Sequence, residues 1–253
     1  MIKIKTDSRK IVPGDTFVAL PGISSDGHDY IDLAIKNGAT KIVAEHGSYS
    51  APTVIVPDTR VYLNQLLEQE YGYIIDEMKI VGITGTNGKT TSCYLTYQIL
   101  NNLGIKCAYI GTIGFYLKDK VRNLPNTSVD IADLYGLLVE SYENGYKYVC
   151  LEVSSQGLSM NRFQTIKFDV AVFTNLTQDH LDYHKTMDNY CVAKQQLFKQ
   201  IKKNGKAIIN SDDKYKDHYL LNDNDNVTFG KNGDYKILSM KFSSKISLLE
   251  YSY

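Results

Sequence analysis

Short apolar runs alternate with longer amphipathic stretches over most of the second part of the chain. Four of the short runs predict buried strands: 79–83, 148–153, 169–173 and 206–209. Three other segments show the 3.6-residue spacing of amphipathic helices: 90–103, 130–144 and 188–203. Buried strands that alternate with helices favour an α/β fold with a mostly parallel, doubly wound sheet. Residues 228–253 alternate weakly and predict one or two strands with no covering helix after them, so this sheet is expected to be incomplete at its C-terminal end.

The first 77 residues predict a smaller α/β unit. Three runs predict strands: 14–20, 42–44 and 54–56. One helix is expected from Tyr30 to the Asn37-Gly38 stop signal, and a second one over 59–70. We therefore expect two domains, residues 1–77 and residues 78–253.

The composition is that of a folded protein without a charge bias. Hydrophobic residues make up 43% of the 253 positions, which is enough for a core, and 28 basic residues balance 28 acidic ones. This balance gives no electrostatic reason to expect nucleic acid as a partner. The charged segment 1–9 is no signal peptide, and no window approaches the roughly 18 apolar residues of a spanning helix. We expect a soluble, cytoplasmic monomer without membrane insertion.

The cysteines give no sign of a metal site. No C-x-x-C pair occurs, and the spacing fits no zinc pattern. Reduced thiols are expected at all four positions: Cys93, Cys107, Cys150 and Cys191.

A glycine-rich segment, 82–91, lies between a predicted strand and a predicted helix. Glycines there allow backbone N–H groups to converge on phosphate oxygens, and the helix start adds the positive end of its dipole. Lys89 is placed to reach the β- and γ-phosphates of a nucleotide, and the Thr90 hydroxyl to bind Mg²⁺. The match to G-x-x-x-x-G-K-[ST] is off by one position, because Ile83 stands where the pattern has glycine.

Polar residues at predicted strand ends add a candidate metal site. Glu152 ends a predicted parallel strand, so it faces the crevice where ligands bind in such sheets, and a carboxylate beside a phosphate loop suits Mg²⁺. His180 and His184 are four residues apart, so a helix would place both on one face. A zinc pair is an alternative, although no third ligand stands nearby, and His184 is equally well explained as a hydrogen-bonded structural histidine.

Lys194 lies at the edge of a helical apolar stripe. The stripe consists of Tyr190, Ala193, Leu197 and Phe198. From this pattern alone, Lys194 is a lysine that snorkels from the buried face to solvent.

Four motifs together resemble the Mur ligases, a family of ATP-dependent amide ligases. They are G-T-N-G-K-T (85–90), E-V-S-S (152–155), T-N-L-T-Q-D-H-L-D-Y-H (174–184) and Y-C-V-A-K-Q-Q-L-F (190–198). The first motif also resembles the ATP loop of the folylpolyglutamate synthetases. The resemblance extends from residue 6 to about residue 240 and includes D-S-R (7–9) and D-G-H-D-Y (26–30) in the N-terminal part.

The resemblance implies a P-loop ATPase-like central domain with the following roles. ATP is bound by Gly85, Thr86, Asn87, Gly88, Lys89, Thr90, Thr91 and Asn175. Mg²⁺ is bound by Thr90, Glu152, His180 and a CO₂-derived carbamate on Lys194, and Lys89, Glu152, His180 and Lys194 count as catalytic. The nucleotide-linked precursor is held by Ser8, Ser24, Ser25, Asp26, Asn126, Thr127, Ser128, Ser154 and Arg162.

The implied reaction adds the third amino acid to UDP-N-acetylmuramoyl-L-Ala-D-Glu in peptidoglycan synthesis, through an acyl phosphate. The resemblance also implies a C-terminal domain for which no sequence remains after residue 253, so this chain is expected to be inactive alone. Two departures from the family pattern are Ser128 in place of threonine and Gln156 in place of histidine. The alternatives are a non-catalytic paralogue that only binds precursor and ATP, and a folylpolyglutamate synthetase-like ligase.

Overall fold

The computed structural model describes residues 2–22, 25–221, 225–242 and 247–252. The chain folds into two compact units. The first comprises Met1–Glu77 and Asp130–Asn144, and the second comprises Met78–Val129 and Gly145–Tyr253. Within the described residues, no helix is both long and apolar enough to cross a membrane.

The first unit is built on a four-stranded parallel sheet with the order β1-β2-β3-β4. Its strands are β1 (Ile4–Lys5), β2 (Thr16–Val18), β3 (Lys41–Ala44) and β4 (Thr53–Ile55). Its helices are η1 (Ser8–Lys10), η2 (Gly27–Tyr30), α1 (Ile31–Lys36), α2 (Thr59–Asp76) and α4 (Ile131–Glu143). The core forms where the apolar residues of β2 and β3 meet those of α1, among them Phe17, Ala34 and Ile42.

Helix α2 is longer than its apolar pattern predicts. It begins after Asp58, whose carboxylate accepts a hydrogen bond from Val61 N at 2.9 Å, an ordinary N-cap. Leu63 and Leu67, four residues apart, are fully buried. The helix continues past residue 70 to Asp76, and α2 packs against α4 within the same unit.

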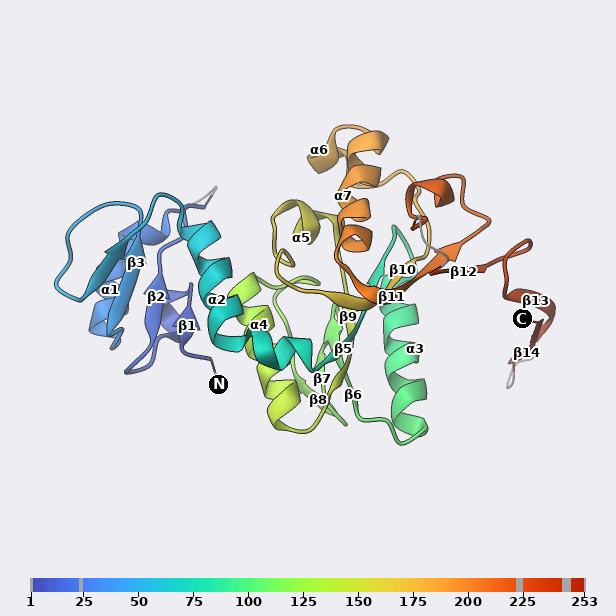
Figure 1. Cartoon of the computed structure of the whole chain (residues 1–253), viewed down its shortest axis with the longest axis horizontal. Helices are drawn as coiled ribbons and strands as arrows, with labels where there is room; N and C mark the ends of the chain where they lie inside the picture. The colour runs from blue at the N-terminus through green and yellow to red at the C-terminus, as the bar shows by residue number, and fades with distance from the viewer. Residues whose placement is uncertain (1, 23–24, 222–224, 243–246, 253) are drawn as a thin grey trace. The chain divides into compact units, whose positions relative to one another are not determined.

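The described residues of the second unit form an eight-stranded sheet. Figure 1 labels its strands. Along the sheet, its strands are β12 (Asn226–Phe229), β11 (Ile201–Asn210), β10 (Phe168–Phe173), β5 (Lys79–Thr84), β9 (Tyr148–Glu152), β6 (Cys107–Gly111), β7 (Gly114–Tyr116) and β8 (Lys120–Arg122). The strands from β12 to β6 are parallel, and β7 and β8 add an antiparallel edge. The prediction of an α/β fold with a mostly parallel sheet is confirmed.

The helices of the second unit alternate with its parallel strands. They are α3 (Lys89–Asn102), α5 (Ser155–Ser159), α6 (Leu181–His184), α7 (Met187–Lys199) and η3 (Lys216–His218). Two of the predicted helices, 90–103 and 188–203, lie in this unit as α3 and α7, and the predicted helix 130–144 is α4 of the first unit. A separate antiparallel hairpin consists of β13 (Lys236–Phe242) and β14 (Ser247–Ser252). The C-terminal stretch thus holds these two strands besides β12.

The predicted helix 188–203 was wrong at its end. Helix α7 stops at Lys199, and β11 begins at Ile201. The Lys202 ammonium donates to the Asp169 carboxylate at 2.9 Å and to Met78 O at 3.0 Å, and these contacts hold this part of the chain beside β10.

The strand order places three strand ends side by side. Strand β5 lies between β9 and β10, and all three run parallel. In register, Ile83 faces Glu152 and Thr84 faces Phe173, so the carboxyl ends of the three strands meet at one edge. From β5 the chain goes to β6 and then returns to β9, which lies between β5 and β6. It next crosses to β10 on the other side of β5, so the strand order reverses at β5. In open α/β sheets, ligands bind outside the strand ends at such a reversal.

Candidate nucleotide and metal site

The glycine-rich loop runs from Thr84, the last residue of β5, to Lys89, the first residue of α3. Gly85 and Gly88 have φ angles of +152° and +85°, which residues with a Cβ rarely adopt. A Cβ at Gly85 would also collide with the Thr174 hydroxyl. No side chain caps α3 at Gly88, so its first N–H groups are left for another acceptor, as in helix starts that bind phosphate.

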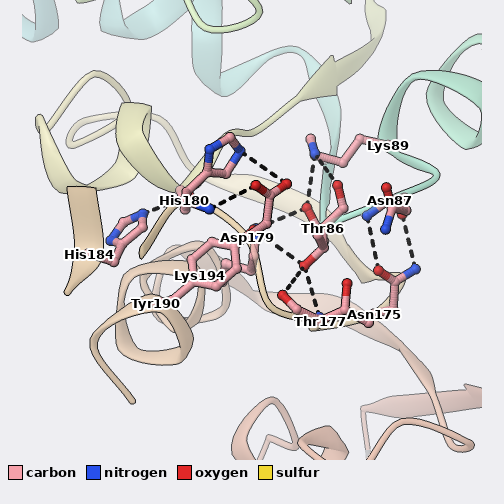
Figure 2. Close-up of polar contacts among 12 residues, drawn as sticks. Thr86, Asn87, Lys89, Asn175, Thr177, Asp179, His180, His184, Tyr190 and Lys194 are labelled. Atoms are coloured by element: carbon pink, nitrogen blue, oxygen red, sulfur yellow. Dashed lines mark hydrogen bonds and ion pairs between the residues drawn. The ribbon is translucent and has the colours of Figure 1, made fainter. Parts of the chain in front are cut away.

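Residues of the loop after β10 hold this segment in shape (Figure 2). The Asn175 side chain accepts from Asn87 N at 3.0 Å and donates to Asn87 O at 3.1 Å. The Thr86 hydroxyl donates to Thr177 O at 3.2 Å and accepts from Thr177 N at 3.0 Å. The loop is therefore held in shape by the Asn175 side chain and by its own Thr86 hydroxyl.

Lys89 is folded back over the loop. Its ammonium donates to Gly85 O and Thr86 O, both at 2.9 Å. Partial burial lowers the pKa of Lys89. An ammonium that rests on backbone carbonyls can turn to an anionic ligand without breaking an ion pair.

Glu152 is fully buried at the end of β9 and accepts four hydrogen bonds. Its Oε2 accepts from the Thr90 hydroxyl at 2.7 Å and from the Thr112 hydroxyl at 3.0 Å. Its Oε1 accepts from Thr112 N at 3.0 Å and from the Tyr109 hydroxyl. Burial and the adjacent carboxylate raise the pKa of Tyr109, so the phenol stays protonated and donates.

The donors around Glu152 fit a magnesium ion. Mg²⁺ takes one or two carboxylates, keeps several waters and shares the oxygens of bound phosphates. Here one carboxylate meets the hydroxyls of Thr90 and Thr112 beside the loop. The described part of the chain contains no group of three or more His, Cys, Asp or Glu side chains that could hold a metal ion. The zinc alternative therefore has no support.

The two histidines of the 174–184 motif lie in different surroundings. Helix α6 begins only after His180, which adopts φ +52°, so the prediction that one helix face carries both histidines is wrong. The His180 side chain is exposed, and its Nε2 lies 3.6 Å from Asp179 Oδ2. His184 is buried, with Nε2 2.9 Å from Ser155 Oγ and its ring stacked on Tyr190 at 4.9 Å. Burial, then the charge of Lys194, lowers the pKa of His184, which is the environment of a structural, neutral histidine.

Lys194 is almost completely buried, with 1% of its surface exposed. The interpretation as a snorkelling lysine is therefore wrong. Its ammonium donates to Gly85 O at 2.9 Å, the same carbonyl that Lys89 uses, and lies 4.4 Å from the centre of the Tyr190 ring. Burial, followed by the charge of Lys89, holds the pKa of Lys194 well below its ordinary value.

Four of the residues expected to bind the nucleotide-linked precursor take part in polar contacts of the second unit. Ser128 Oγ lies 2.8 Å from Ser154 Oγ and accepts from Ser154 N at 3.1 Å, and Arg162 donates to Ser128 O at 2.5 Å. The Thr127 hydroxyl lies 2.9 Å from the Thr112 hydroxyl, which in turn donates to Glu152. Asn126 is exposed. Thr127 is therefore linked to the carboxylate, and the two serines and Arg162 form a second polar cluster.

The first unit contains a separate cavity of about 610 Å³. Ser8 and Ser25 line it, with Tyr30, Arg60 and Asp130. Asp26 is not among its lining residues. Its carboxylate instead caps η2 through His28 N at 2.9 Å and contacts His28 Nδ1 at 2.6 Å. Ser24 lies outside the described residues.

Sequence reasoning missed Tyr109, Thr112 and the role of Tyr190. Thr112 follows directly on strand β6, so its place at the carboxyl end of a parallel strand was a usable signal. Tyr190 was recognised only as a core residue, although its ring contacts His180, His184 and Lys194. Tyr109 lies within a continuous apolar strand, and nothing in that pattern distinguishes it from packing.

The strand-loop-helix with its lysine, the buried strand-end glutamate and the reversal of strand order define a P-loop-type nucleotide-binding α/β fold. The family description "Mur ligase middle domain" matches residues 83–251, and "Mur ligase family, catalytic domain" matches residues 3–71. This chain belongs to the Mur ligase family.

Curated relatives carry the name UDP-N-acetylmuramoyl-L-alanyl-D-glutamate–2,6-diaminopimelate ligase. The one from Fusobacterium nucleatum is 36% identical over 98% of this chain and 54% of its own length. The one from Aquifex aeolicus is 38% identical over 99% of this chain and 52% of its own length. The chain thus spans about half the length of the curated relatives it matches.

Solved structures agree with this assignment. The structure of a UDP-N-acetylmuramoyl-L-alanyl-D-glutamate–2,6-diaminopimelate ligase has a TM-score of 0.78 and 28% identity, over 98% of this chain and 53% of that one. The MurF ligase from Thermotoga maritima in complex with ADP has a TM-score of 0.70 and 25% identity, over 98% and 55%. A folylpolyglutamate synthase from Mycobacterium tuberculosis has a TM-score of 0.60 at 14% identity over 76% of this chain and 51% of its own, which shows a shared fold.

Proposed function

We propose that this chain supplies the precursor site and the ATP site of a ligase that adds the third amino acid to UDP-N-acetylmuramoyl-L-Ala-D-Glu. The observation that carries the proposal is the polar network in the second unit. It links the phosphate loop, through Thr90 and Glu152, to the Thr127 hydroxyl beside the proposed precursor site. An ATP γ-phosphate and a substrate carboxylate that met there would be held by adjacent groups.

The names of the relatives support the choice of substrate. The diaminopimelate ligases from F. nucleatum and A. aeolicus are named for UDP-N-acetylmuramoyl-L-alanyl-D-glutamate. The match of residues 3–71 to the Mur ligase family favours this function over folate chemistry. The ADP in the T. maritima ligase supports ATP as the nucleotide.

In the proposed reaction, the substrate carboxylate oxygen attacks the γ-phosphorus of ATP, and the bond from that phosphorus to the ADP oxygen breaks. The amine of the incoming amino acid then attacks the acyl phosphate, loses a proton, and phosphate leaves as the amide forms. The chain's part in this is positioning and charge stabilisation. The loop N–H groups and Lys89 bind the phosphates, and Thr90 and Glu152 would hold Mg²⁺, which offsets charge on the phosphoryl oxygens when bound.

Arg162, Ser154 and Ser128 would orient the precursor's diphosphate and sugar, with Arg162 pairing with phosphate oxygens. The cavity lined by Ser8 and Ser25 would take the uridine end. These assignments predict that precursor binding depends on both groups of residues.

Calorimetry with the UDP-muramoyl dipeptide tests the precursor site. We expect Arg162→Ala to weaken binding about 10- to 100-fold, because one charge-assisted hydrogen bond contributes ~1.5–3 kcal/mol. The exposed Lys167→Ala is the matched control and should bind as the wild type does. A wild-type chain with no affinity for the dipeptide precursor would refute the substrate assignment.

A ligation assay separates an enzyme from a protein that only binds. The chain is incubated with precursor, Mg²⁺-ATP and a panel of amines that includes lysine and diaminopimelate, and products are read by mass spectrometry. Because this chain is expected not to ligate alone, the expected result is precursor-dependent ADP release without a tripeptide product. Binding of both substrates without any ADP release would favour the binding-only alternative.

The proposed carbamate on Lys194 is testable separately. Carbamylation requires a neutral amine, and the lowered pKa of the buried Lys194 favours that form. The product would be an anion suited to Mg²⁺. Carbon-13 NMR with labelled bicarbonate should show a carbamate signal that is absent from Lys194→Ala and present in the control Lys199→Ala.

A further inference from the structure

The two oxygens of Glu152 have different kinds of partners. Oε2 accepts from two hydroxyls, those of Thr90 and Thr112, which can rotate away from the carboxylate. Oε1 accepts from a backbone group, Thr112 N, and from the Tyr109 hydroxyl. The carboxylate is therefore held on one side and exchangeable on the other.

The position of the Tyr109 hydroxyl is determined by the protein core. The Tyr109 ring is fully buried. Tyr94 and Tyr116 pack edge-on against it, with ring centres 5.5 and 5.7 Å away at 89° and 79°. Tyr97 packs against it at 6.2 Å. A ring fixed by three others cannot follow the carboxylate, so the carboxylate must follow the ring.

The backbone beside the pair leaves space for this contact. A Cβ at Gly111 would lie 2.6 Å from the Tyr109 hydroxyl and 2.7 Å from Glu152 Cδ. Any larger residue would displace one of the two groups. Strand β6 thus contributes both the donor and the room that the donor needs.

We propose that Tyr109 is a positioning residue that locks Oε1 of Glu152 and thereby leaves Oε2, on the side of Thr90, as the oxygen offered to the metal ion of bound nucleotide. This inference rests on the proposed function, because it takes Glu152 as the magnesium ligand. Tyr109 itself touches neither nucleotide nor substrate in this assignment and acts only through Glu152.

Loss of the Tyr109 hydroxyl should lower the affinity for the metal ion. Partners that orient a metal ligand typically contribute 10- to 100-fold to affinity. In Tyr109→Phe, the ring packing stays and Oε1 retains only Thr112 N. The factor by which Mg²⁺ increases ATP affinity should be about tenfold smaller in Tyr109→Phe than in the wild type. The ATP affinity without metal should be unchanged.

Tyr97→Phe is the matched control. Tyr97 belongs to the same ring cluster, but its hydroxyl donates to Leu117 O and Lys118 O, both at 2.8 Å. Its removal should lower the melting temperature without changing the effect of Mg²⁺ on ATP affinity. Calorimetric titration of ATP with Mg²⁺ and with EDTA gives both affinities, and Mn²⁺ titration followed by EPR gives metal affinity directly.

A double-mutant cycle tests whether Tyr109 affects metal binding through Glu152. In a Glu152→Gln background, Tyr109→Phe should cause no further loss of metal dependence, because the ligand it orients is already altered. Gly111→Ala places a methyl group against the same carboxylate and should cause a similar metal-dependent loss, which keeps the test available if Tyr109→Phe folds poorly.

The outcomes distinguish failure of the Tyr109 positioning role from failure of the proposed function. If the wild type shows no Mg²⁺-dependent ATP affinity, the proposed function fails and this inference fails with it. If the wild type shows it and both Tyr109→Phe and Gly111→Ala retain it, only the positioning role is overturned. An equal loss in Tyr97→Phe would also overturn it, since that result would indicate general damage to the cluster.

Discussion

Replacement of Lys194 by methionine should stabilise the protein in the absence of CO₂. The Lys194 ammonium is buried, and its protein partners are one carbonyl, Gly85 O at 2.9 Å, and the Tyr190 ring at 4.4 Å. No ion pair between Lys194 and a carboxylate is present among the described residues; the charge of Lys89 opposes the ammonium, and the charge of Asp179 offsets this only partly. Methionine has a similar length and needs no hydrogen bond.

The size of the stabilisation by Lys194→Met follows from opposing contributions to the free energy of unfolding. Desolvation of a buried ion costs several kcal/mol. A charge-assisted hydrogen bond returns ~1.5–3 kcal/mol, and the cation–π contact ~0.5–2 kcal/mol. The remaining cost is about 1–3 kcal/mol, so Lys194→Met should raise the free energy of unfolding by that amount at pH 7, or the melting temperature by several degrees.

The stabilisation of Lys194→Met relative to the wild type should become smaller as the pH rises. The pKa of Lys194 is lowered from 10.5 in the folded state, so the native protein releases this proton at a lower pH than the unfolded chain does. Wild-type stability therefore increases with pH from the folded pKa up to 10.5, by at most about 1.4 kcal/mol per pH unit, whereas the methionine variant lacks this contribution.

The assay is urea unfolding of wild type, Lys194→Met and Lys199→Met in CO₂-free buffer at pH 7 and pH 9.5. Lys199 is exposed on the same helix, and its replacement should change stability by less than about 0.5 kcal/mol. A Lys194→Met protein less stable than wild type at pH 7 would refute the reasoning, because the buried ammonium would then be net stabilising.

Three further results are expected from the same structure. Asn175→Ala removes both side-chain contacts to Asn87 and should weaken ATP binding about 5- to 30-fold in calorimetry; an unchanged affinity would show that the loop does not need this support. Below pH 6.5, stability should fall, because the pKa of His184 is lowered from that value and the unfolded chain takes up the proton first; His184→Gln should flatten this step in urea unfolding at pH 7.5 and pH 5.5, and an equal slope in both proteins would exclude His184 as its source. Asp169→Asn weakens pairing with Lys79 and Lys202 and should lower the unfolding free energy by ~1–3 kcal/mol; a change below about 0.5 kcal/mol would mean that solvent replaces these contacts.

The sequence predicted those features that local patterns determine. The strands around β5, β9 and β10 were visible as continuous apolar runs, and the loop at Gly85–Lys89 as a glycine-rich turn between a strand and a helix. Glu152 was identified because the end of a parallel strand has one location relative to the ligand crevice. These inferences need only neighbouring residues.

Features that depend on tertiary contacts were not predictable in this way. Whether Lys194 reaches solvent depends on what covers α7, and the pattern of that helix alone places it at an edge. The separation of His180 from His184 depends on a left-handed residue at position 180, which no periodicity indicates. The contact between Tyr109 and Glu152 joins residues 43 positions apart on strands whose adjacency the sequence does not give.

The most direct test of the central claim is the binding of Mg²⁺-ATP by this chain and by Lys89→Ala. Lys118→Ala, a change at an exposed lysine of the same unit, is the control. We expect calorimetry to show one Mg²⁺-dependent ATP site in the wild type and in the control, and no detectable binding in Lys89→Ala, because the loop then lacks the cation that meets the β- and γ-phosphates. Equal ATP affinity in all three proteins would show that the loop is not the nucleotide site and would contradict the account.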